Sequence, residues 1–143
     1  MKPLILIALA ATTSAGAVYA NHSPASVTIS VHQTPPGNGK QMYASYCASC
    51  HGAYGRGDGP VALQLSKRPP DLSMLSKNNG GKFPSEHVMA VIQFGAANPR
   101  RGAAEMPVWG PILGEMDAAY AGQTREMNRI VNLDRFVETL QAK

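Results

Sequence analysis

The chain has 143 residues, which is the size of a single domain and leaves little room for a second core. Charged residues make up 15% and aromatic residues 6%, whereas 14 glycines and 11 prolines predict long loops, and this composition excludes a coiled coil. The formal net charge is +4, and the two cysteines are too few for a disulfide-stapled mini-protein or a four-cysteine zinc ribbon.

The first twenty residues are typical of a secretory signal. Lys2 precedes an apolar run over residues 4–11, and the segment closes on small residues that predict cleavage between Ala20 and Asn21. An uncleaved anchor is the alternative, but the run is far shorter than the roughly 18 apolar residues of a spanning helix. We therefore expect export to the periplasm of a mature chain without a transmembrane segment.

Residues 21–38 are predicted to form an extended N-terminal arm ahead of a helical domain over residues 39–143. Within the arm, residues 27–31 alternate between apolar and polar side chains like a short strand, and Pro35, Pro36 and Gly37 end it with a turn. A single strand without a partner is not stable by itself, so the pattern favours a flexible arm.

The helical domain is predicted to be all-α, with three to five short helices joined by long Gly- and Pro-rich loops. Ser85 is expected to cap a helix that Gly95 ends, and the last helix carries apolar residues at helical spacing. Such short helices bury too little apolar surface on their own, which indicates that a non-protein group completes the core. The expected helical segments are residues 39–47, 61–66, a turn at 73–76, 85–94, and a final helix from about residue 124.

The motif with the most specific chemistry is C-x-x-C-H, formed by Cys47, Cys50 and His51. At the end of a helix, this spacing brings the two thiols and the imidazole to nearly one face. Two thiols so placed can add to the two vinyl groups of a haem and form thioethers, while the imidazole is aimed at the iron. The motif therefore predicts one covalently attached haem c.

Three other kinds of site could use this motif. A redox-active dithiol is expected beside a βαβ unit, and the chain shows no such pattern. A zinc site needs a fourth ligand, for which Asp58 and His87 are conceivable but lack the usual spacing. A disulfide across two residues is strained and rare.

Over residues 39–141 the chain resembles the class I cytochromes c, in which a few helices wrap around one haem and transfer single electrons. Landmarks of that family follow in order: C-x-x-C-H at 47–51, Gly59-Pro60, and M-P-x-W-G at 106–110. The resemblance also implies that Phe136 of the last helix packs against Gly39 and Tyr43 of the first.

Met106 is the expected second axial ligand, opposite His51. It lies in a Pro- and Gly-rich loop, where Pro107 restricts the backbone, and it coincides with the methionine of the family's loop. Met116 is the alternative, and core packing is the preferred interpretation for Met42, Met89 and Met127. The remaining candidate ligands are Met74, His22, His32 and His87, the last being expected to face solvent.

Weaker assignments concern the surroundings of the haem. In the resembling family the proline carbonyl of Gly-Pro accepts the second N–H of the axial histidine, a role that would fall to Pro60, although Pro60 also suits a helix start. Trp109 is expected to line the haem or bond a propionate, with ordinary core packing as the alternative. The candidates to neutralise the haem propionates are the basic side chains of Arg68, Lys82, Arg100 and Arg101.

Charge is unevenly distributed along the chain. Residues 40–101 hold eight basic and three acidic side chains, whereas residues 102–143 hold four and six. If the first segment surrounds the haem edge, an acidic docking face is expected on the redox partner. No basic run exceeds two residues, which argues against nucleic acid.

The sequence therefore predicts an exported electron-transfer protein rather than an enzyme. It is expected to act as a free carrier or as the cytochrome subunit of a periplasmic dehydrogenase or oxidase, because the stretches at 58–60 and 68–72 resemble those of such subunits. The alternative is a haem sensor or peroxidase-like catalyst with an open sixth position. No distal acid–base group is identifiable for that alternative.

Overall fold

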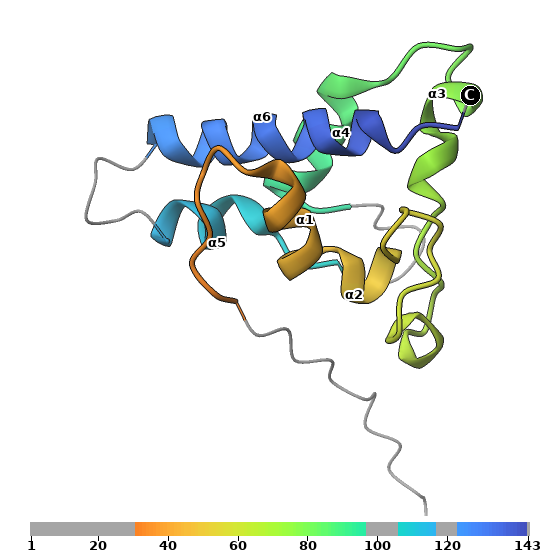
Figure 1. Ribbon diagram of the computed structural model, residues 1–143, viewed down its shortest axis with the longest axis horizontal. Helices are drawn as coiled ribbons and strands as arrows, with labels where there is room; N and C mark the ends of the chain where they lie inside the picture. Colours follow the sequence, from red (N-terminus) through yellow and green to blue (C-terminus); the bar gives the residue numbers. More distant parts are fainter. Residues whose placement is uncertain (1–30, 97–105, 117–122, 143) are drawn as a thin grey trace, which may run out of the picture.

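The structure is a computed structural model that describes residues 31–96, 106–116 and 123–142, and it contains no strand within these ranges. The predicted signal segment and residues 27–30 of the alternating stretch lie outside them. The all-α prediction is confirmed (Figure 1). In chain order the elements are α1 (Gly39–Tyr46), α2 (Ala48–His51), the 3₁₀-helices η1 (Ala62–Gln64) and η2 (Leu72–Met74), α3 (Leu75–Asn78), α4 (Ser85–Phe94), α5 (Trp109–Glu115) and α6 (Gln123–Thr139).

The longest helix, α6, organises the fold. It has 17 residues and packs against α1, α4 and α5, which lie along it in Figure 1. Among the described helices, none has the length and apolar character needed to cross a membrane. Apart from Ala62 of η1, the buried hydrophobic side chains of the described residues form one cluster drawn from these four helices, namely Met42, Tyr43, Tyr46, Val88, Ile92, Trp109, Leu113, Ile130, Leu133 and Val137.

The helices α1 and α6 cross at Gly39. A Cβ atom added to Gly39 would lie 2.0 Å from the carbonyl oxygen of Asn132, so only glycine permits this approach. One turn further on, the rings of Tyr43 and Phe136 pack with their centroids 5.1 Å apart. The expected packing of Phe136 against Gly39 and Tyr43 is therefore confirmed.

Helix α5 was not expected, because residues 95–114 were predicted to be loop. Pro111 and two glycines within residues 109–115 argue against a helix on propensity alone. Pro111 is the third residue of α5, however, and the first turn of a helix leaves its N–H groups unbonded in any case. The burial of Trp109 and Leu113, which are 3% and 0% exposed, stabilises the helix against that low propensity.

Helix α4 has the predicted bounds, and Gly95 ends it with a φ of 84°. The prediction that Ser85 caps it is wrong: Pro84 is the N-cap residue and Ser85 is the first helical residue. The reason is tertiary, because the Ser85 hydroxyl donates to Oδ2 of Asp134 in α6 at 2.7 Å.

The described part of the arm, residues 31–38, is bound to the helical domain. Thr34 is 6% exposed, and Nδ2 of Asn132 donates to the carbonyl of Pro36 at 3.2 Å. Asn38 caps α1 by accepting a bond from the backbone N–H of Gln41. This segment is therefore anchored, whereas the sequence favoured a flexible arm, because its polar groups find partners on helices distant in the chain.

Replacing Gly39 with alanine should destabilise the protein by about 1–3 kcal/mol, because the added methyl group forces α1 away from α6. Denaturant unfolding of the haem-loaded protein measures this change. Gly37→Ala is the matched control, since nothing lies within 4 Å of a Cβ added there. Equal effects of the two substitutions would contradict the close crossing.

Asp134→Asn should stabilise the protein increasingly as pH rises. Asp134 is 4% exposed and its Oδ1 has no hydrogen-bond partner. Burial raises its pKa; the Ser85 bond partly lowers it, and the charges of Glu138 and Arg135 act in opposite directions. The pKa of Asp134 is therefore higher in the folded protein than in the unfolded chain, so its protonated form stabilises the fold. This stabilisation is complete below the unfolded-state pKa, and it is lost as the pH rises through the folded-state pKa.

The measurement is the free energy of unfolding of the wild type and of Asp134→Asn. It is made at about pH 3.5 and at about pH 7, on either side of the ordinary pKa of an aspartate side chain. The advantage of the asparagine variant should be larger at the higher pH. An advantage that is constant or shrinks with pH would show that Asp134 ionises freely in the folded protein.

Candidate haem site

The C-x-x-C-H motif occupies a single turn at the junction of α1 and α2. Cys47 ends α1 and starts α2, and its carbonyl accepts the backbone N–H of His51 at 2.8 Å and that of Cys50 at 3.1 Å. The backbone thus brings the three residues onto one turn, as predicted. Both cysteines are free thiols.

A glycine-rich loop folds back over this turn. The backbone N–H of Gly57 donates to the carbonyl of His51 at 2.8 Å, and Gly52 adopts a φ of 80° that favours glycine. A Cβ atom on Gly59 would lie 2.3 Å from the carbonyl oxygen of Ser49. The loop therefore supports α2 through backbone contact and fixes the residue that follows His51.

His51 is buried, with 8% of its surface exposed, and its Nδ1 atom has no hydrogen-bond partner. Burial lowers the pKa of His51, and a backbone hydrogen bond with Pro70 opposes this in part. The imidazole is therefore neutral at pH 7, which is the form that binds a metal. The expected bond from Nδ1 to the Pro60 carbonyl is not formed in this structure, and the role of Pro60 stays a prediction.

The surroundings of Cys47 favour its protonated thiol. Burial raises the pKa of Cys47 to about 12, and the neighbouring Cys50 adds to this effect. The described residues contain no group of three or more His, Cys, Asp or Glu side chains that could hold a metal ion, so the zinc alternative gains no support from them.

Met106 lies three residues before α5, and Trp109 is the first residue of that helix. Met106 is half-buried and packs against the hydrophobic cluster. The Trp109 ring stacks on Tyr46 with centroids 5.5 Å apart. The segment carrying Met106 is thereby linked to the residue directly before Cys47. This stacking is the core-packing role considered for Trp109, and a contact with haem stays a prediction.

The other candidate axial ligands are placed differently. Met42 is fully buried, as expected, but Met127 is 43% exposed, so its assignment to the core is wrong, because its position on α6 faces solvent. The Met116 sulfur lies 3.5 Å from the Tyr46 hydroxyl oxygen. His32 and His87 are exposed, Met74 and Met89 are half-buried, and His22 lies outside the described residues.

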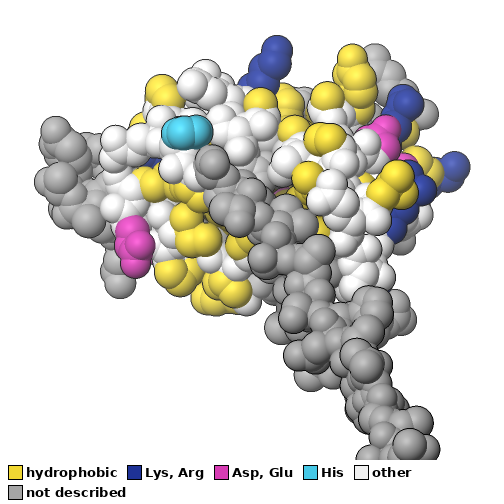
Figure 2. Space-filling model, turned by 90° about the horizontal axis from the view of Figure 1, so that it is seen from below, with side chains coloured by type: hydrophobic (Ala, Val, Ile, Leu, Met, Phe, Trp, Pro, Cys, Tyr) yellow, Lys and Arg dark blue, Asp and Glu magenta, His cyan; other side chains and the backbone are white. Residues whose placement is uncertain are grey.

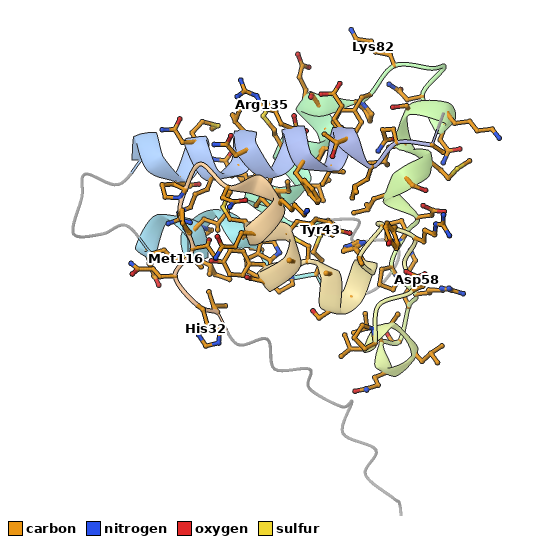
Figure 3. The ribbon with its side chains drawn as sticks, in the orientation of Figure 1. His32, Tyr43, Asp58, Lys82, Met116 and Arg135 are labelled. Carbon is orange, nitrogen blue, oxygen red and sulfur yellow. The ribbon has the colours of Figure 1, made fainter. Side chains whose placement is uncertain are left out.

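Of the basic residues considered for the propionates, Arg68 and Lys82 are exposed. Nε of Arg68 donates to the carbonyl of Gly57 at 3.1 Å, which ties it to the loop over α2. Lys82 lies on the opposite side of the fold from Met116 in Figure 3. Arg100 and Arg101 lie outside the described residues.

These residues fit a covalently bound haem. Two free thiols and a buried imidazole with an unpartnered nitrogen share one turn, and a methionine lies three residues before a helix packed on that region. An all-helical fold with this donor set defines a c-type cytochrome.

Comparison with known proteins agrees with this class. The family model described as cytochrome c oxidase, cbb3-type, subunit III matches residues 34–122, and the chain belongs to this family. No curated protein and no solved structure matches the chain. Family membership implies covalently bound haem c and a haem-based role in electron transfer.

Proposed function

We propose that the protein is an exported single-haem cytochrome that passes one electron between redox partners, with His51 and Met106 as axial ligands. The observation that carries the proposal is the buried, neutral imidazole of His51, whose Nδ1 is unpartnered, beside two free thiols. Haem iron, when bound, supplies the reversible one-electron chemistry.

The residues of the chain have distinct tasks in this proposal. Cys47 and Cys50 tether the haem through thioethers, so that it is retained outside the cell. His51 supplies a nitrogen ligand, and the soft thioether of Met106 favours the reduced state. The buried stack of Tyr46 on Trp109 excludes water between the two ligand-bearing segments.

Two further features belong to the proposal. The apolar run of residues 4–11 supports cleavage after Ala20 and a periplasmic location. The description of the matched family as an oxidase subunit supports work as the cytochrome subunit of a larger redox enzyme, with a free carrier as the second possibility.

The Met106→Ala variant should lose the weak near-infrared sulfur–iron charge-transfer band of the oxidised protein, because it lacks the thioether ligand. Optical spectra of wild type and variant measure this directly. Met127→Ala is the matched control, since the Met127 side chain is exposed on α6 and should leave the band unchanged.

Two outcomes would contradict this ligand assignment. Persistence of the band in Met106→Ala would assign the sulfur to another methionine. Absence of the band in the wild type, together with ready binding of carbon monoxide to the reduced protein, would replace electron transfer with catalysis or sensing.

The basic character of the first half of the chain supports an acidic partner. The loop over α2 and the following segment expose Arg56, Lys67, Arg68 and Lys77. Figure 2 shows hydrophobic side chains on one face of the molecule, and several lysine and arginine side chains at one end of it, beside acidic ones. Complementary charge would steer an acidic redox protein toward this end.

Reduction by an acidic redox protein should therefore slow as ionic strength rises, because salt screens the attraction between the two docking faces. Stopped-flow rates at about 20 and about 200 mM salt test this, since the Debye length falls several-fold over that range. An uncharged small-molecule reductant is the control and should react at nearly constant rate. A salt-independent rate with the protein partner would refute electrostatic docking.

A further inference from the structure

Tyr46 touches both ends of α5. Its ring stacks on Trp109, the first residue of the helix, at a centroid distance of 5.5 Å and an interplanar angle of 29°. Its phenol oxygen lies 3.5 Å from the sulfur of Met116, which caps the other end of α5. The side chain that directly precedes Cys47 thus contacts both ends of α5, the helix that follows Met106.

The phenol group is fixed by a chain of hydrogen bonds. Nη1 of the buried Arg129 donates to Oγ1 of Thr34 at 3.2 Å, and this hydroxyl lies 2.8 Å from the Tyr46 hydroxyl. The Tyr46 hydroxyl also donates to the carbonyl of His32. Because the His32 carbonyl can only accept, the single Tyr46 proton goes to it, and the Thr34 hydroxyl, which accepts from Arg129, is then the donor to the Tyr46 oxygen.

The N-terminal arm reinforces the same contact. Nε2 of Gln33 donates to the carbonyl of Met116, at the end of α5 that the phenol reaches. Figure 3 shows Met116 and His32 close together at one end of the fold, remote from Asp58 at the other. Gln33 of the arm and Tyr46 of α1 therefore both contact Met116, at the C-terminal end of α5.

We propose that Tyr46 is a positioning residue that sets how firmly Met106 holds the haem iron. The inference rests on the proposed ligation by His51 and Met106. Thioether bonds at Cys47 fix the haem to the end of α1, whereas Met106 reaches it from the segment just before α5. The strength of the sulfur–iron bond then depends on how rigidly α5 is held against α1, and Tyr46 is the side chain that spans the two.

The test is the affinity of the oxidised, haem-loaded protein for imidazole, which competes with Met106 and removes the sulfur–iron band. Tyr46→Phe keeps the stack on Trp109 and removes only the hydroxyl. Loss of this buried hydrogen-bonding group should raise the apparent imidazole affinity about tenfold. Thr34→Val removes the next hydroxyl in the chain and should shift the affinity in the same direction.

Tyr43→Phe is the matched control. Tyr43 lies on the same helix with the same 1% exposure as Tyr46, but its hydroxyl donates to the carbonyl of Gly52 at 2.8 Å instead of contacting α5. It should lower the denaturant midpoint comparably while leaving the imidazole affinity unchanged. A purely structural role of Tyr46 would make the two phenylalanine variants behave alike.

The outcomes separate this inference from the proposed function. Wild-type affinity in both Tyr46→Phe and Thr34→Val, or an equal rise in Tyr43→Phe, would overturn the positioning role and leave the axial ligands intact. If Tyr46→Phe fails to fold, Thr34→Val decides alone. A wild type without the sulfur–iron band would overturn both the ligation and the inference.

Discussion

The close crossing of α1 and α6 at Gly39 is the constraint on which the rest of the structure depends. Backbone contact at this point, with Tyr43 packed on Phe136 one turn away, fixes α1 against the longest helix. The attachment motif begins where α1 ends, so its position follows from the crossing. α6 also packs on α4 and α5, and it thereby relates the motif to the segment that carries Met106.

The proposed ligation, with the haem held at one turn and Met106 reaching it from a distant segment, requires two separate parts of the fold to keep a fixed relative position. Cys47, Cys50 and His51 are placed by local helix geometry, whereas Met106 depends on the docking of α5. The structure couples the two through buried aromatic packing and a directed hydrogen-bond chain that begins at Arg129. Such coupling would keep the two proposed ligands in one geometry, which suits a centre that changes charge with little rearrangement.

The buried polar groups serve this arrangement at different cost. Arg129 is 1% exposed and contacts Thr34 and the sulfur of Met42, so its burial is accompanied by hydrogen bonds within the core. Asp134 has one satisfied and one unsatisfied oxygen, and it joins α6 to the first residue of α4. Arg129 thus orders the arm and, through it, α5. Asp134 holds α4 against α6, but its unsatisfied oxygen lowers the stability of the fold.

The sequence by itself determined the features that depend on neighbours in the chain. The C-x-x-C-H turn and the end of α4 at Gly95 follow from spacing and backbone freedom. The close approach at Gly39 joins residues that are distant in the chain, and it followed only from the resemblance to the class I cytochromes c. The helix around Pro111, the bond of Ser85 to Asp134, the exposure of Met127 and the contacts of Tyr46 are visible only in the folded structure. These depend on which surface a distant helix presents, because burial and hydrogen bonding between α1, α5 and α6 outweigh local propensity.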